Sequence, residues 1–207
     1  MSQGSVKITL VYHSGYGHTA AIAEHVAKGA RDAGAEVTVL KAEEADPTGA
    51  EFSEAHAIIF GSPTYMGNVS GPFKVFADKT SKPWFTLAWK DKIAGGFTHS
   101  GSWSGDKGVT LHTLQTLAAQ HAMIWIGNDL MPGHNTVAGS IEDLNRIGSF
   151  GGLMTQSPVD AGAEAIPPSD LKTAEHYGAR IAQATARWNG VTLDVASATA
   201  GEALGIS

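Results

Sequence analysis

Residues 6–20, VKITLVYHSGYGHTA, join an apolar run to a glycine-rich loop and then to a helical pattern. The run Val6–Tyr12 predicts a buried strand, and Thr19–Ala33, which has apolar residues at helical spacing, predicts a helix. The loop between them directs backbone N–H groups and hydroxyls at one point, at the positive end of the helix, where a phosphate is stabilised. This segment therefore predicts a strand–loop–helix unit with a phosphate site.

The rest of the chain continues the alternation of short apolar runs with helical segments, which is typical of a parallel sheet covered by helices. Further strands are expected at Glu36–Lys41, Ala57–Phe60, Ile93–Thr98 and Met123–Ile126. Further helices are expected from Pro72, over Val109–His121, and from a cap at Ser169. Residues 128–168, rich in Gly, Pro and Ser, are expected to cross the surface. We expect one domain over residues 1–207, with its core at 6–189 and a tail at 190–207.

Composition excludes several function classes. The 207 residues contain no cysteine, which excludes disulfides, thiolate catalysis and thiolate metal sites. The net charge of −6 and the lack of a basic cluster argue against a nucleic-acid surface. No signal-peptide pattern or membrane-spanning apolar run is present, so a cytoplasmic protein is expected. The nine histidines lack metal-ligand spacing, so no metal is expected.

Three polar loops follow the first, third and fourth expected strands, and ligands of such sheets bind beyond the carboxyl ends of the strands. Residues 14–19, 61–68 and 98–105 are rich in glycine and hydroxyl side chains. The first loop lacks the Gly-Lys-Ser/Thr ending of a nucleoside-triphosphate loop. The three loops together suit the phosphate, ribityl chain and ring of a flavin mononucleotide.

A dinucleotide is the alternative ligand, because GYGHTA also satisfies the loose G-x-G-x-x-G/A pattern. That pattern needs an acidic residue at the end of the second strand, to bind a ribose hydroxyl. Here the strand ends Leu40-Lys41-Ala42, and Glu43 comes late. The sequence therefore favours a mononucleotide, and a nicotinamide-binding dehydrogenase remains the weaker interpretation.

The segments YHSGYGHT, IIFGSPTYMGNVSG and FTHSGSWSGDKG, in this order, resemble the flavodoxin-like NAD(P)H:quinone oxidoreductases of the tryptophan-repressor-binding-protein family. The resemblance covers residues 6–189. It implies a flavodoxin-like α/β three-layer sandwich, with five parallel strands in the order 2-1-3-4-5 and helices on both faces. It also implies FMN as cofactor and a ping-pong transfer of two electrons from NADH or NADPH to a quinone or similar small acceptor. Members often form tetramers in which neighbouring subunits complete each site, so a homodimer or homotetramer is expected here. The alternative function is that of a flavodoxin-type FMN electron carrier without substrate turnover.

The resemblance also assigns roles to individual residues. Tyr16 and Trp84 are expected to bind substrate, and Tyr16 and His121 are the catalytic candidates. The expected FMN-binding residues are Ser14, Gly15, Tyr16, Gly17, His18 and Thr19; Pro63, Thr64, Tyr65, Met66, Gly67 and Asn68; His99, Ser100, Gly101, Ser102, Trp103 and Ser104; and Gln120.

Overall fold

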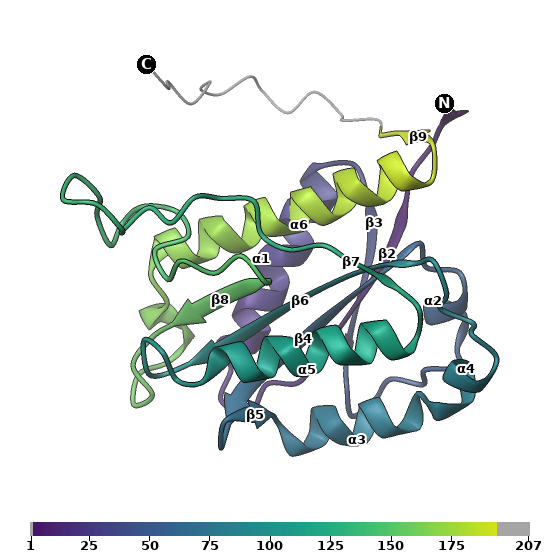
Figure 1. Ribbon diagram of the computed structural model, residues 1–207, viewed down its shortest axis with the longest axis horizontal. Coiled ribbons are helices and arrows are strands. Elements are labelled where there is room, and N and C mark those ends of the chain that lie inside the picture. The colour runs from purple at the N-terminus through teal and green to yellow at the C-terminus, as the bar shows by residue number, and fades with distance from the viewer. Residues whose placement is uncertain (1, 194–207) are drawn as a thin grey trace.

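The computed structural model describes residues 2–193 as an α/β fold built on one large sheet (Figure 1). Its main strands lie in the order β3-β2-β4-β6-β7 and are all parallel. Their bounds are β2 Lys7–Tyr12, β3 Glu36–Lys41, β4 Ala57–Tyr65, β6 Ile93–Ser100 and β7 Ile124–Trp125. Numbered among themselves, these strands have the expected order 2-1-3-4-5, and the flavodoxin-like fold is confirmed. The sheet holds seven strands rather than five, because β5 and β8 pair with it as well.

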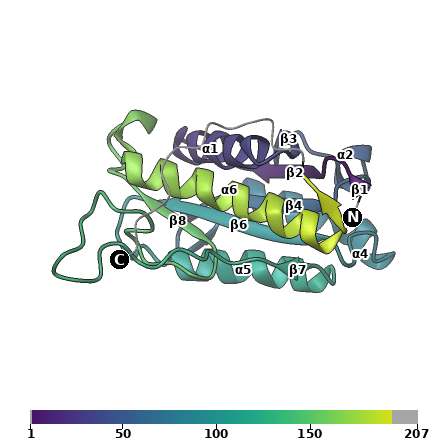
Figure 2. The same cartoon turned by 90° about the horizontal axis from the view of Figure 1, so that it is seen from above.

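Helices cover both faces of the sheet, as the view in Figure 2 shows, with α1 and α6 on one side and α5 on the other. The helices are α1 His18–Asp32, α2 Ala50–Ser53, α3 Gly71–Lys79, α4 Ser81–Phe85, α5 Lys107–Gln120 and α6 Pro168–Trp188, with a 3-10 turn at Ala163–Ala165. One buried apolar cluster joins α1 and α6 to the sheet, and a second joins α3 and α5 to the other face. Two glycines let α1 and α6 touch, because a Cβ at Gly178 would stand 1.9 Å from the carbonyl oxygen of Val26, and one at Gly29 would stand 1.8 Å from that of Glu175.

The third expected strand is longer than Ala57–Phe60. β4 continues to Tyr65 and folds back on β5 (Asn68–Val69) as an antiparallel hairpin. Met66 and Gly67 form its turn with φ of 48° and 78°, the positive values that a two-residue hairpin turn requires. The residues expected as loop 61–68 are therefore mostly strand and turn.

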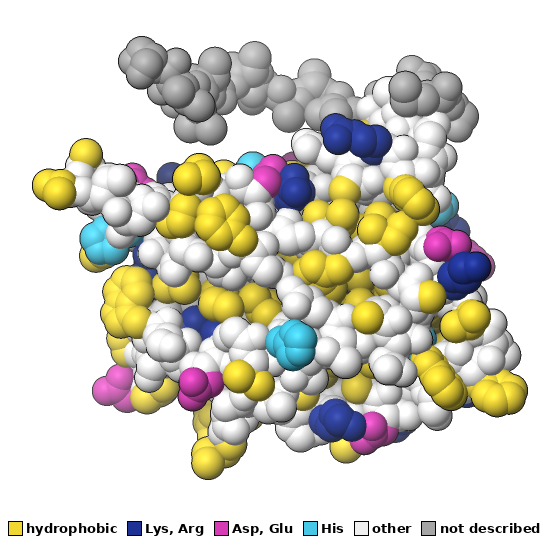
Figure 3. Space-filling view, in the orientation of Figure 1, with side chains coloured by type: hydrophobic (Ala, Val, Ile, Leu, Met, Phe, Trp, Pro, Cys, Tyr) yellow, Lys and Arg dark blue, Asp and Glu magenta, His cyan; other side chains and the backbone are white. Residues whose placement is uncertain are grey.

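The fifth strand is split into two segments that pair with different parts of β6. β7 pairs with the first residues of β6, and β8 (Leu153–Gln156) pairs with the last. The hydroxyl of Tyr177 lies where the segments separate: it accepts from the Gly96 N–H and donates to the Ile126 carbonyl. The prediction that residues 128–168 only cross the surface is wrong, because the segment returns to the sheet and buries Arg146 and Ser157. Figure 3 shows the outer face of this region, where hydrophobic side chains lie among polar ones and charged side chains are few.

Element ends differ slightly from those expected. The N-cap position of α6 is Pro167 rather than Ser169, and no side chain caps the helix; the Ser169 hydroxyl donates to the Ile141 carbonyl. β1 (Ser2–Gln3) pairs with β9 (Val191–Thr192), so the expected tail begins with a strand, and its residues 194–207 lie outside the described part. Within residues 2–193, no helix has the length and apolar character needed to span a bilayer.

Candidate functional site

A pocket of about 420 Å³ lies at the carboxyl ends of β2, β4 and β6, where the three polar loops meet. This volume is within the usual range of small-molecule sites. The lining residues are Ser14, Tyr16, His18, Thr19, Pro63, Thr64, Tyr65, His99, Ser100, Gly101 and Val159. All but Val159 were expected at the site, so the structure brings the core of all three predicted loops together.

The start of α1 forms one wall of this pocket. Gly17 precedes the helix with φ of 90°, and its N–H donates to Ser14 Oγ over 3.1 Å. His18 and Thr19 are the first helical residues, so their backbone N–H groups have no acceptor within the helix. A Cβ built on Gly17 would have no other atom within 4 Å, so the space in front of the N-terminus of α1 is open. None of the described residues lining the pocket is Lys or Arg, so an anion here would be held by neutral donors and the helix dipole.

Two histidines from different loops stack inside the pocket. The rings of His18 and His99 have centroids 4.9 Å apart and planes 5° from parallel. His99 Nδ1 lies 3.0 Å from Thr155 Oγ1, and its Nε2 lies 3.3 Å from Ser157 Oγ. Burial, with smaller effects from His18 and nearby cations, lowers the pKa of His99 to about 3. His99 is therefore a neutral ring at physiological pH, hydrogen-bonded on both nitrogens.

The β4–β5 hairpin supplies the second wall through its strand rather than its turn. Thr64 Oγ1 lies 2.8 Å from Thr98 Oγ1 and 2.7 Å from Thr110 Oγ1, which ties β4 to β6 and α5. The hydroxyl of Tyr65 lies over Gly15, where a Cβ would stand 2.6 Å from that oxygen. Gly15 itself and the turn residues Met66, Gly67 and Asn68 are not among the lining residues, and the Met66 side chain is fully exposed.

The third wall comes from the end of β6 and the loop after it. Ser100 and Gly101 line the pocket, whereas Ser102, Trp103 and Ser104 are exposed and are not among the lining residues. Burial lowers the pKa of Lys107, which is fully buried beneath this loop, to about 8. The guanidinium of Arg146, which is buried, lies 4.6 Å from the centroid of the Trp103 ring.

Three residues expected at the site lie at the opposite, amino-terminal edge of the sheet. Gln120 ends α5 and His121 follows it, while Trp84 lies in α4. His121 is 1% exposed, its Nε2 lies 2.8 Å from Thr80 Oγ1, and burial lowers its pKa to about 4. The prediction of His121 as a catalytic residue is therefore corrected: α5 carries the chain from one edge of the sheet to the other, and His121 is a buried structural side chain. Trp84 is 44% exposed and cannot reach the pocket of its own chain.

The sequence reading missed Val159, Thr155 and Ser157, which reach the pocket or His99 from β8 and the residues after it. It also missed Lys107 and Arg146, the cations around the third loop. The sequence signal was weak: Leu153–Gln156 is a four-residue run bounded by Gly151-Gly152 and Pro158, with no apolar–polar alternation to mark it as a strand.

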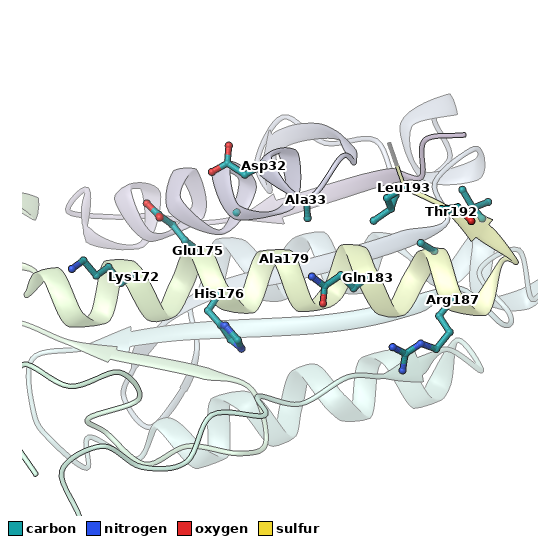
Figure 4. A pocket seen from close by; sticks show the side chains of 13 residues that line it. Asp32, Ala33, Lys172, Glu175, His176, Ala179, Gln183, Arg187, Thr192 and Leu193 are labelled. Atoms are coloured by element: carbon teal, nitrogen blue, oxygen red, sulfur yellow. The ribbon is translucent and has the colours of Figure 1, made fainter. Parts of the chain in front are cut away.

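A larger cavity, of about 840 Å³, lies between α1, α6 and β9. Figure 4 shows its side chains along the outer sides of the two helices, including Asp32, Glu175 and His176. None of the expected site residues lines it, and it lies outside the helical layer rather than at the carboxyl ends of the strands. The smaller pocket is therefore the candidate site.

The sequence model of the NADPH-dependent FMN reductase family matches residues 6–136 of this chain. The chain is 46% identical over 179 residues to "Flavodoxin FldP" of Pseudomonas aeruginosa, covering 86% of this chain and 95% of that protein. A flavodoxin, WrbA-like protein from Agrobacterium tumefaciens matches with a TM-score of 0.68 and 40% identity, covering 88% of this chain and 99% of that one. An archaeal flavodoxin matches in fold, with a TM-score of 0.60 at 21% identity, over 87% of this chain and 99% of that one. The chain thus belongs to the NADPH-dependent FMN reductase family of flavodoxin-like proteins, with FMN as its cofactor.

Proposed function

We propose that this chain is an FMN-dependent oxidoreductase that passes two electrons from NADH or NADPH to quinones or similar small acceptors in a ping-pong cycle. The observation that carries the proposal is the pocket itself, which combines an anion-binding helix start with an open aromatic rim. Tyr16 stands at this rim with 79% of its surface exposed, 6.2 Å from Tyr65 between ring centroids. Such a rim suits a second planar molecule that enters and leaves.

The residues present fit FMN. The N–H groups at the start of α1 and the hydroxyls of Ser14 and Thr19 suit a phosphate, and the glycine at position 17 leaves room for its close approach. Pro63–Tyr65 and Ser100–Gly101 offer backbone polar groups and an aromatic side chain for the ribityl chain and ring. When bound, FMN supplies the two-electron chemistry, and the protein binds, orients and tunes it.

In this scheme the protein side chains bind and position the nicotinamide and the acceptor. Tyr16 and Tyr65 offer apolar faces to a nicotinamide or quinone ring, and the exposed hydroxyl of Tyr16 is placed to donate a hydrogen bond to an acceptor oxygen. His99 holds β6 to the β8 segment and is neutral, so it adds no charge to the pocket. His121 has no part, because it is buried at the other edge of the sheet.

We further propose a homodimer or homotetramer. Trp84, the second substrate-binding candidate, is exposed at the amino-terminal edge beside the exposed side chains of Phe85 and Leu87. Only a second copy of the chain could bring Trp84 to a pocket at the carboxyl edge.

The alternative function, an FMN electron carrier, is supported by the name of the Pseudomonas aeruginosa relative, a flavodoxin. The test is the visible absorbance of the FMN-loaded protein under anaerobic conditions. We expect NADH or NADPH to bleach the flavin and benzoquinone to restore its colour rapidly. A protein that binds FMN but is bleached by neither nicotinamide would be a carrier. A protein that binds no FMN would contradict both proposals.

A further inference from the structure

We propose that Lys107 is a positioning residue for the third loop of the pocket and that its buried ammonium group raises the reduction potential of the bound FMN. The inference rests on the FMN pocket proposed above. It gives a role to a cation that the sequence motifs did not single out.

Lys107 uses all three of its N–H donors on one loop. Its Nζ donates to Ser100 Oγ over 2.9 Å, to the Ser102 carbonyl over 2.6 Å and to the Trp103 carbonyl over 2.8 Å. Ser100 lines the pocket and also donates to the Ser102 carbonyl over 3.0 Å. The ammonium group is therefore separated from the pocket by a single hydroxyl, and it fixes the shape of the wall that contains that hydroxyl.

The backbone before α5 is shaped to bring Lys107 under the loop. Gly105 and Asp106 both have φ of 54°, so two successive left-handed residues reverse the chain. A Cβ at Gly105 would stand 2.2 Å from Ser100 Oγ, so only glycine fits there. The turn thus packs directly on the serine that Lys107 holds.

A second buried cation, Arg146, contacts the loop at Trp103. Arg146, on the segment between β7 and β8, stacks on Trp103, and its Nε and Nη2 donate to the two carboxylate oxygens of Asp170 in α6 over 2.8 and 2.9 Å. Arg146 is thereby neutralised by a buried partner. Within residues 2–193, no carboxylate forms such a pair with Lys107.

The charges around the third loop therefore leave one positive charge uncompensated. Arg146 and Asp170 cancel, His99 is neutral, and Lys107 remains. A positive charge in a buried site interacts more strongly with nearby negative charge than it would in water. Because reduction adds negative charge to the flavin, this ammonium group favours the reduced form.

The test uses full-length protein loaded with FMN and two substitutions. Lys107→Met removes the charge and the donors, whereas Lys107→Gln removes the charge and keeps an N–H donor. We expect both to reduce the ratio of affinities for reduced and oxidised FMN about tenfold, which is about 30 mV of midpoint potential for a two-electron couple. Lys107→Met is also expected to weaken the binding of oxidised FMN, measured by flavin fluorescence, more than Lys107→Gln does.

Lys92→Met is the matched control. Lys92 also donates to backbone carbonyls, those of Ser53 and Ala55, but it precedes β6 at the opposite edge of the sheet. We expect this substitution to leave the potential and the FMN affinity unchanged. A folded Lys107→Met or Lys107→Gln protein with the wild-type potential would overturn the inference.

If both variants fail to fold, the pH dependence of the midpoint potential of the wild-type protein gives an independent test. The groups that face Lys107 are Arg146, Asp170 and His99. Because added negative charge on the flavin strengthens proton binding at Lys107, the midpoint potential should fall more steeply with pH above pH 8 than below it. An unchanged slope would contradict the inference. Failure of the wild-type protein to bind FMN would instead contradict the proposed function.

Discussion

The rings of His18 and His99 lie face to face, 4.9 Å apart, and link the first turn of α1 to the last residues of β6. Two cationic rings at this distance would repel each other, and burial already disfavours a charge on His99. The stack is thus compatible with a neutral His99, whose nitrogens are both engaged by Thr155 and Ser157. It joins the phosphate loop to the β8 segment, so the pocket depends on the return of the split fifth strand to the sheet.

We expect the protein to lose stability in acid through two buried histidines. Their pKa values fall from 6.5 to about 3 for His99 and to about 4 for His121. Below pH 6.5 the unfolded chain binds protons at these rings that the folded chain does not bind, so unfolding becomes easier as the pH falls. Each group contributes a slope of about 1.4 kcal/mol per pH unit, down to its folded pKa. Urea unfolding between pH 7 and 4.5 measures this slope.

The share of His121 can be isolated with His121→Gln, which cannot titrate in this range. We expect the slope of this variant to fall by about one proton relative to wild type. His112→Gln, at an exposed position of α5, is the control and should leave the slope unchanged. Equal slopes for wild type and His121→Gln would show that His121 is charged in the folded protein.

Gly17→Ala tests the phosphate cradle. Gly17 has φ of 90° and Gly190, after α6, has φ of 65°, and a Cβ at either would meet no atom within 4 Å. Both alanine variants should therefore lose about 1 kcal/mol of stability through backbone strain alone. Only Gly17→Ala should weaken FMN binding, by at least tenfold, because its methyl group enters the space before the helix start. Isothermal titration calorimetry measures the FMN affinity of each variant. Equal affinities for Gly17→Ala and Gly190→Ala would contradict the placement of the phosphate.

Thr110→Val tests the threonine cluster beneath the pocket. Thr110 is fully buried and its hydroxyl lies 2.7 Å from that of Thr64, whereas Thr116, two turns along α5, is exposed and bonds only to the His112 carbonyl. Loss of the buried hydrogen bond should cost about 1–2 kcal/mol in Thr110→Val, and Thr116→Val should change stability by less than about 0.5 kcal/mol. Thermal unfolding of the two variants gives the comparison, and equal melting temperatures would show that the cluster contributes nothing.

The parts of this fold that follow local patterns were predictable from the sequence. Val6–Tyr12 and Glu36–Lys41 appear as strands β2 and β3 with little change, because apolar and β-branched runs next to glycine loops encode them directly. The lining residues other than Val159 were identified because each lies at or just after the carboxyl end of a strand at the same edge of the sheet. The pairing of Leu153–Gln156 with β6 was not predictable, because it depends on a long-range contact across the chain.

The misplacement of His121 has a related cause. The motif match identifies the residues next to His121 in the sequence. The edge of the sheet at which His121 lies is set instead by the length and direction of α5. Lys107 was missed for the opposite reason: a lysine near a helix start is usually a solvated side chain, and only the left-handed turn at Gly105 and Asp106 places it under the loop.

Trp84→Ala tests whether a second copy of the chain completes the site. Trp84 lies in α4, at the edge of the sheet opposite the pocket, so the substitution should leave the FMN affinity of the protein unchanged. If a neighbouring copy brings Trp84 to the rim, the KM for benzoquinone should rise several-fold, and light scattering should show a dimer or tetramer in the wild-type protein. Trp188→Ala, which removes a tryptophan of similar exposure at the end of α6, is the control and should leave this KM unchanged. A wild-type monomer with undiminished turnover would contradict the oligomer, because within one chain Trp84 and the pocket remain on opposite edges of the sheet.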